Sequence, residues 1–304
     1  MNTSVRASID LGTNTCLLLV AEWEPGRTEP DRVLADVSTV VRLGQGVDKN
    51  RSLAPDAMER TLACLRKYAS RLTELGGDPS TAVCLATSQA RDAANGSDFF
   101  ETVVRETGFR FRVISGDEEA RVTFSGGLLP GMDPARSVVV DIGGGSTELI
   151  SSRGGQSLDM GSVRFTERYL QSDPVTDEQF WNCQAAIDAQ LEKLRSWREA
   201  LGAHADLVAV AGTATAIAAE HLGLEQFDAS RIDTAALSRG DIHRIVEELK
   251  WRTVKERLEL PGMEPGRADV ILAGAMILWR TMEVLDFAHC RISTRGLRYG
   301  ALKI

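Results

Sequence analysis

The sequence predicts an α/β protein made of two similar halves, and three observations support this. Short apolar segments alternate with turn residues and helix-like stretches, a pattern typical of α/β folds. The 304 residues correspond to about two domains. A similar segment also occurs twice: residues 9–12 read Ile-Asp-Leu-Gly, and residues 140–143 read Val-Asp-Ile-Gly. The offset of 131 residues between Asp10 and Asp141 is about the length of a domain.

Both repeated segments are expected to form β-hairpins. Residues 5–10 and 16–21 are apolar strands on either side of a turn. Residues 137–141 and 148–151 flank a glycine-rich turn in the same way.

A buried strand then leads into a helix in each half. Residues 82–88 precede a helix through Arg91, and residues 207–211 precede an alanine-rich helix over residues 214–222. The two halves therefore follow the same plan.

Further helices are predicted by capping and periodicity. Pro55 begins a helix that runs to about Leu75, and Thr176 and Ser238 begin two more as capping boxes. The remaining elements are a long apolar helix, a strand that enters a turn and a short helix, over residues 267–285, 292–296 and 297–304.

Composition excludes some classes of function. There are 35 Lys and Arg against 43 Asp and Glu, a formal net charge of −8, which does not suit a dedicated nucleic-acid or anionic-membrane binder. The apolar run at residues 16–21 is too short to span a bilayer, and no signal peptide is expected. Five scattered cysteines without a C-x-x-C pair predict reduced thiols in the cytoplasm.

The turn of the second hairpin predicts a phosphate site. Successive glycines let the backbone approach an anion, and neighbouring hydroxyls add donors. Asp141 and Glu148, at the two strand ends, are oxygen ligands of the kind that magnesium prefers. The turn consists of Gly143, Gly144, Gly145, Ser146 and Thr147.

The turn of the first hairpin has a similar sequence with fewer glycines, and it predicts a second phosphate site. Its candidate substrate-binding residues are Asp10, Gly12, Thr13, Asn14 and Thr15. The alternative is that this hairpin only holds its domain together.

Other known site motifs are absent from the sequence. No G-x-x-x-x-G-K-[ST] segment occurs, no G-x-G-x-x-G follows a strand, and no histidine lies in a recognisable catalytic motif.

Six segments, in order and over essentially the whole chain, resemble the exopolyphosphatase / guanosine pentaphosphate phosphohydrolase (Ppx/GppA) family, in its short two-domain form. They are residues 9–15, 86–95, 114–121, 141–148, 161–164 and 267–271. The resemblance implies two actin-like domains of the ribonuclease H-like (ASKHA) superfamily that flank an interdomain cleft. We expect domains at residues 1–124 and 125–296, with the helix at 297–304 packed back onto the first.

The resemblance also implies roles for individual residues. Glu119 matches the general base that activates water, with Glu118 as its rival, and Arg91 matches a phosphate-binding arginine. Asp141 and Glu148 match magnesium ligands. Gly212 and Thr213 match the nucleoside-side turn of the superfamily, and Leu17 departs from the Arg or His that many members carry.

The expected activity is metal-assisted hydrolysis of the terminal phosphoanhydride of inorganic polyphosphate, which releases orthophosphate. The alternative substrate within the family is pppGpp, converted to ppGpp. An ATP-dependent kinase and a non-catalytic phosphate sensor are the other readings, and both are disfavoured. Mg²⁺ or another divalent cation is the expected cofactor, no nucleic-acid or membrane partner is expected, and the resemblance allows a homodimer.

Overall fold

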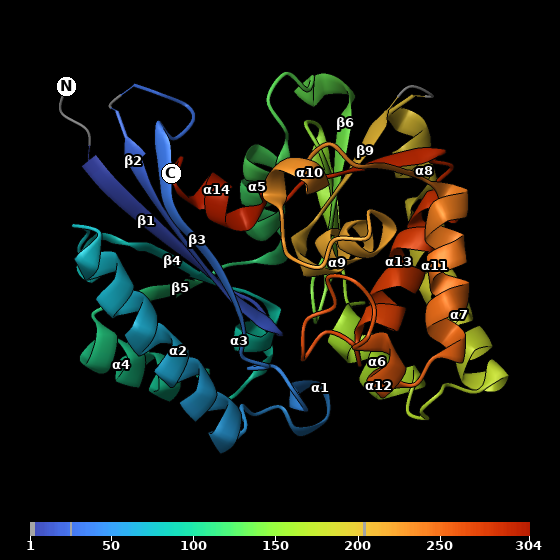
Figure 1. Cartoon of the computed structure of the whole chain (residues 1–304), viewed down its shortest axis with the longest axis horizontal. Coiled ribbons are helices and arrows are strands. Elements are labelled where there is room, and N and C mark those ends of the chain that lie inside the picture. The colour runs from blue at the N-terminus through green and yellow to red at the C-terminus, as the bar shows by residue number, and fades with distance from the viewer. Residues whose placement is uncertain (1–3, 25, 203–204) are drawn as a thin grey trace. The chain divides into compact units, whose positions relative to one another are not determined.

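The computed structural model describes residues 4–24, 26–202 and 205–304, which fold into two compact units (Figure 1). Unit 1 contains residues 1–126 together with residues 297–304, and unit 2 contains residues 127–296. The predicted α/β class is confirmed, because each unit has a mixed β-sheet with helices packed against it.

Unit 1 has a five-stranded sheet in the order β3-β2-β1-β4-β5. The first three strands are antiparallel, whereas β4 and β5 run parallel to β1. The predicted hairpin of β1 and β2 is confirmed; in addition, β3 pairs with β2 and β5 pairs with β4. The strands are β1 (Ser4–Leu11), β2 (Thr15–Trp23), β3 (Arg32–Val40), β4 (Val83–Ala86) and β5 (Phe111–Val113).

Helices cover both faces of this sheet (Figure 1). The long helix begins at Pro55 as predicted, and its buried side chains, such as Leu65 and Tyr68, pack with Ile9 and Leu18 of the sheet. The helices are α1 (Val47–Asn50), α2 (Pro55–Glu74), α3 (Ser88–Asp92), α4 (Gly96–Thr107), α5 (Gly116–Gly127) and α14 (Leu297–Ala301), with a 3₁₀ turn η1 (Pro79–Thr81).

Unit 2 has a six-stranded sheet in the order β10-β11-β9-β6-β7-β8. Strands β6, β7, β8, β9 and β11 repeat the order of β1 to β5, so the repeat in the sequence is a repeat of topology. The strands are β6 (Ser137–Ile142), β7 (Thr147–Ser151), β8 (Gly154–Leu158), β9 (Asp206–Val210), β10 (Ala236–Ser238) and β11 (His289–Ile292). The strand predicted to enter a turn within residues 292–296 is β11, which begins earlier, at His289, and ends at Ile292, shortly before a bend.

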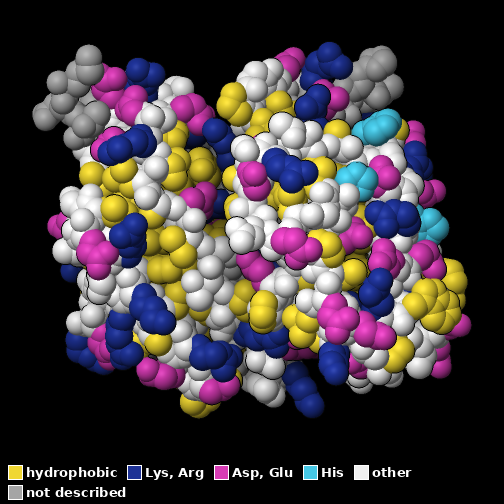
Figure 2. All heavy atoms as spheres, in the orientation of Figure 1, with side chains coloured by type: hydrophobic (Ala, Val, Ile, Leu, Met, Phe, Trp, Pro, Cys, Tyr) yellow, Lys and Arg dark blue, Asp and Glu magenta, His cyan; other side chains and the backbone are white. Residues whose placement is uncertain are grey.

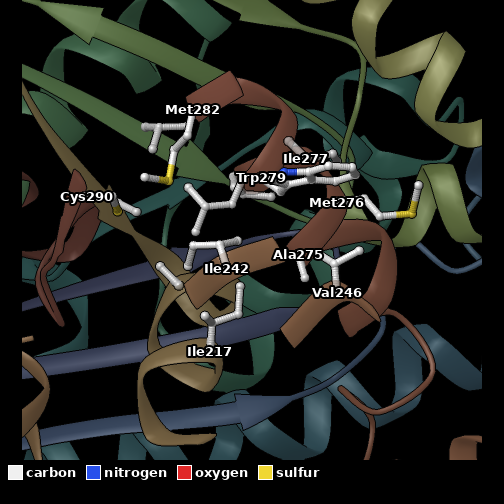
Figure 3. Packing of buried hydrophobic residues seen from close by; sticks show 14 of the residues in the cluster. Ile217, Ile242, Val246, Ala275, Met276, Ile277, Trp279, Met282 and Cys290 are labelled. Carbon is white, nitrogen blue, oxygen red and sulfur yellow. The ribbon is translucent and has the colours of Figure 1, made fainter. Parts of the chain in front are cut away.

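The core of unit 2 is built around α13, in which every residue except Arg280 and Glu283 is buried. Figure 3 shows Met276, Ile277 and Trp279 of α13 among Ile242 and Val246 of α11. The helices are α6 (Ser162–Tyr169), α7 (Asp177–Leu191), α8 (Arg195–Ala200), α9 (Ala211–His221), α10 (Ala229–Ile232), α11 (Arg239–Trp251), α12 (Val254–Arg257) and α13 (Ile271–Val284), with 3₁₀ turns η2 (Pro134–Arg136) and η3 (Glu192–Leu194).

Two local predictions in unit 2 need correction. Helix α13 begins at Ile271 rather than at Arg267, because residues 267–270 form turns in which Val270 N bonds to Arg267 O. Ser238 and Asp241 form the predicted capping box. At Thr176, the side chain accepts the Gln179 N–H as predicted, but the Gln179 side chain bonds to Ser172 instead of to the Thr176 backbone.

Within the described residues, no helix is both long and apolar enough to cross a bilayer. All five cysteines are described, and each is a buried free thiol. On the face drawn in Figure 2, basic and acidic side chains alternate, and the described residues form no large area of one charge.

Candidate functional site

The two hairpin turns share one hydrogen-bond pattern. Gly12 N donates to Thr15 O at 2.9 Å, and Gly143 N donates to Ser146 O at 3.0 Å. These bonds lie at equivalent positions of the repeat, so the two turns have related backbone conformations.

The second turn is fixed from one side by the start of α6. Ser162 N donates to Gly143 O at 2.9 Å, and the amides of Val163 and Arg164 donate to Gly144 O at 2.9 and 3.0 Å. In a trans peptide the N–H points opposite to the C=O of the same unit. The two N–H groups that follow these carbonyls therefore point away from α6, as an anion-binding turn requires.

The first turn is fixed in the same way by the loop after β3. The amides of Val41 and Arg42 both donate to Asn14 O at 2.9 Å, and Gly44 N donates to Thr13 O at 2.8 Å. The N–H groups in the peptide units that contain the Asn14 and Thr13 carbonyls therefore point away from this loop.

Two glycines permit this close packing. A Cβ at Gly161 would lie 2.4 Å from Gly144 O, and a Cβ at Gly44 would lie 2.3 Å from the Thr13 Cγ2 atom. Neither glycine was among the predicted site residues, because each acts on the turn from a distant part of the chain.

Two of the predicted hydroxyl ligands have protein partners. Thr13 Oγ1 lies 3.0 Å from Ser88 Oγ and donates to Gln89 Oε1 at 3.3 Å. Thr147 Oγ1 donates to Met160 O at 2.6 Å. The backbone amides are therefore better candidates than these two hydroxyls for binding an anion at the turns.

Asp141 and Glu148 lie directly opposite each other on β6 and β7. Side chains of directly opposed residues lie on the same face of a sheet, with Cβ atoms about 4.5–5.5 Å apart. Glu148 is 1% exposed and accepts a hydrogen bond of 2.7 Å from Ser157 Oγ. Two carboxylates on one face of the sheet are candidate ligands for a divalent cation.

Asp10 has a different neighbour in unit 1. Its directly opposed residue on β2 is Leu17, at the position that Glu148 occupies in unit 2. The first turn therefore carries one carboxylate where the second carries two.

Arg91 and Glu119 form an ion pair within unit 1. Arg91, in the last turn of α3, donates from Nη1 to Glu119 Oε2 at 3.0 Å and to Ile114 O at 2.7 Å. Glu119 lies in the first turn of α5 and is 7% exposed, whereas the Arg91 side chain is 26% exposed. The sequence predicted both residues, and the structure brings them together.

Glu118 has another partner. Its backbone N–H is capped by Ser115 Oγ at 3.2 Å, as expected, but its carboxylate forms an ion pair with Arg112. The side chain of Arg112 is 53% exposed, so this pair lies at the surface.

The turn between β9 and α9 is covered by an arginine. A Cβ at Gly212 would lie 1.5 Å from Arg267 Nη1, and Glu264 holds this guanidinium through Nε at 2.6 Å. Thr213 packs against Gly274 of α13, where an added Cβ would meet its side chain at 2.6 Å. Arg267 therefore places a guanidinium, paired with Glu264, against this turn.

Known proteins resemble this chain over most of its length. The model of the Ppx/GppA phosphatase family matches residues 22–303. Exopolyphosphatase 2 of Mycobacterium tuberculosis is 37% identical over 294 residues, which cover 90% of this chain and 88% of that protein. The crystal structure of an exopolyphosphatase-like protein matches with a TM-score of 0.88 and 31% identity, over 98% of this chain and 97% of the other.

A longer relative contains the same region. The bifunctional 3-dehydroquinate synthase/phosphatase of Fusobacterium nucleatum is 34% identical over 297 residues, 94% of this chain. The chain spans 44% of the length of that protein.

Proposed function

The chain belongs to the Ppx/GppA phosphatase family, and from this premise we propose that it is an exopolyphosphatase. It would hydrolyse the terminal phosphoanhydride of inorganic polyphosphate and release orthophosphate. The observation that carries the proposal is the Arg91–Glu119 pair, in a protein that also holds two anion-binding turns. Similarity to Exopolyphosphatase 2 supports the same activity.

Glu119 would act as the general base. Its Oε2 accepts a hydrogen bond from Arg91, which fixes the carboxylate so that it can accept the proton of an attacking water. Arg91 bonds to Glu119 and Ile114 through Nη1 alone, and a partly exposed guanidinium can grip phosphoryl oxygens with its other donors. One residue would thus orient both the base and the substrate.

Asp141 and Glu148 fit a divalent cation. Among the residues that the structure describes, no group of three or more His, Cys, Asp or Glu side chains could hold a metal ion. A pair of carboxylates completed by water and phosphate oxygens is the usual magnesium site of phosphoryl-transfer enzymes. When bound, the ion would neutralise charge on the phosphate oxygens.

Arg267 offers a further contact to a polyanionic substrate. Its guanidinium lies against Gly212 and is paired with Glu264, at the turn that matches the nucleoside-side turn of the superfamily. Because a guanidinium can bind a phosphate oxygen or stack on a base, the choice of polyphosphate over a nucleotide rests on the similarity to Exopolyphosphatase 2. The buried free thiols support a reducing, cytoplasmic environment.

Steady-state kinetics on long-chain polyphosphate, tripolyphosphate and pppGpp would test the proposal. We expect Mg²⁺-dependent release of orthophosphate, with a higher kcat/KM for polyphosphate than for pppGpp. The Glu119→Gln variant, purified in parallel, controls for contaminating phosphatases. A higher kcat/KM for pppGpp would assign the chain to alarmone turnover instead, and orthophosphate release that equals the Glu119→Gln background on all three substrates would overturn the hydrolase proposal.

A further inference from the structure

Helix α14 returns to unit 1 and packs against the strand that carries Asp10. Ser8 Oγ donates to Arg298 O at 2.7 Å, and Arg6 Nη1 donates to Leu302 O at 3.4 Å. Alternate residues of a strand face the same side. Asp10 therefore lies on the face of β1 that α14 covers.

Arg298 is the charged residue that α14 buries against this face. It is 7% exposed, and it binds both carboxylate oxygens of Asp36 on β3, at 2.7 and 2.9 Å. Tyr299 Oη donates to the same carboxylate at 3.2 Å. The guanidinium is thus fixed by a bidentate pair, the geometry that arginine holds most firmly.

The carboxylate of Asp10 acts on the same guanidinium. Burial lowers the pKa of Arg298, but the charge and hydrogen bonds of Asp36, followed by Tyr299 and Asp10, raise it, and the net shift is upward. Asp36 and Asp10 therefore both act on the positive charge of Arg298.

The equivalent aspartates of the two units have different neighbours. In unit 2, Asp141 lies opposite Glu148, a pair that fits a divalent cation. In unit 1, Asp10 lies opposite Leu17, and a fixed positive charge comes from Arg298 instead. The two equivalent aspartates therefore have different electrostatic environments.

Helix α14 also contacts the helix that carries Glu119. A Cβ at Gly300 would lie 1.9 Å from Val122 O of α5, and Leu297 and Ala301 pack with Val122 in one buried cluster. Figure 1 shows α14 and α5 side by side. Movement of α14 would therefore disturb both Asp10 and the first turn of α5.

We propose that Arg298 is a positioning residue, which holds the carboxylate of Asp10 in place for phosphate or metal binding at the first turn. The proposal rests on the proposed function, because it assumes that Asp10 contributes to the binding of a phosphate substrate or its metal ion. Asp36 and Tyr299 fix Arg298, and Arg298 in turn orients Asp10.

The Arg298→Gln variant tests this by steady-state kinetics on polyphosphate at varied Mg²⁺. We expect the KM or the half-saturating Mg²⁺ concentration to rise about tenfold, with a smaller change in kcat. Arg298→Lys restores the charge without the bidentate fork and should recover part of the affinity. It also keeps the test available if Arg298→Gln fails to fold.

Arg280 of unit 2 provides a matched control. It binds both carboxylate oxygens of Asp188 at 2.6 and 3.1 Å, and its guanidinium lies over Trp279 as that of Arg298 lies over Tyr299. Arg280→Gln should lower the Tm without changing KM or the Mg²⁺ requirement. If Arg298→Gln also lowers only the Tm, Arg298 merely anchors α14 and the proposal is overturned.

A double-mutant cycle separates this inference from the proposed function. Arg298→Gln, Asp10→Asn and the double variant are compared by urea unfolding, which needs no substrate. Non-additive losses of stability support the Arg298–Asp10 interaction even if no hydrolysis is detected. Additive losses overturn it, whatever the activity.

Discussion

Glu119→Gln is expected to lower kcat on polyphosphate by about 10²–10⁴-fold, the range that general bases contribute. This corresponds to about 3–5 kcal/mol of transition-state stabilisation. Glutamine keeps the shape of the side chain, and its carbonyl oxygen can still accept the hydrogen bond from Arg91, so the fold should be preserved. Its amide cannot accept a proton from water at neutral pH. Circular dichroism and thermal unfolding would verify the fold, and initial rates would measure the loss.

Glu118→Gln is the matched control for this experiment. It makes the same chemical change at the adjacent position, where the carboxylate pairs with the exposed Arg112. Exposed ion pairs contribute little, so stability and kcat should remain close to wild type. A large loss of kcat in Glu118→Gln, with near-normal turnover in Glu119→Gln, would show that the base has been assigned to the wrong carboxylate.

Removal of divalent cations with a chelator should abolish hydrolysis, and added Mg²⁺ should restore it. Asp141 and Glu148 lie directly opposite each other, so without a cation they would repel a polyanionic substrate. Assays after dialysis against the chelator, followed by a Mg²⁺ titration, would measure the requirement. Full activity in excess chelator would rule out a metal-assisted mechanism.

Asp141→Asn locates this requirement within the chain. The variant should need a higher Mg²⁺ concentration for half-maximal activity, while its Tm changes little or rises as the carboxylate repulsion is relieved. Asp206→Asn is the control, because Asp206 is an exposed carboxylate at the start of β9 in the same sheet. A Mg²⁺ titration unchanged in Asp141→Asn would mean that the ion binds elsewhere.

The sequence predicted those parts of the fold that depend on neighbours in the chain. The hairpins were found from the repeated Asp-x-Gly segment, and the long helix was found from Pro55, because turn and helix-start signals are local. The resemblance to the family was also found from the sequence, and the family model confirms it. Strand β3 was missed because it is an edge strand whose residues are all exposed or only partly buried, and β5 because it has three residues.

For the candidate site, the sequence supplied the residue types but not their partners. Arg91 and Glu119 were predicted separately, and their ion pair depends on how α3 and α5 pack. Gly44 and Gly161 were not among the candidates, since their role follows from contacts with turns 31 and 17 residues away, at Thr13 and Gly144. The roles assigned to Asp141, Glu148 and Glu119 remain predictions for the experiments above.

The return of α14 to unit 1 has a consequence for the order of folding. Ser8 and Arg298, which are hydrogen-bonded, are separated by 290 positions, whereas unit 2 is continuous in the chain. During synthesis the whole of unit 2 emerges before Arg298, so unit 2 can fold while unit 1 still exposes the face of β1 that α14 covers. Limited proteolysis of ribosome-bound chains that end at Gly296, followed by a flexible linker long enough to fill the exit tunnel, should therefore find unit 2 protected and unit 1 cleaved, and equal protection of both would contradict this order.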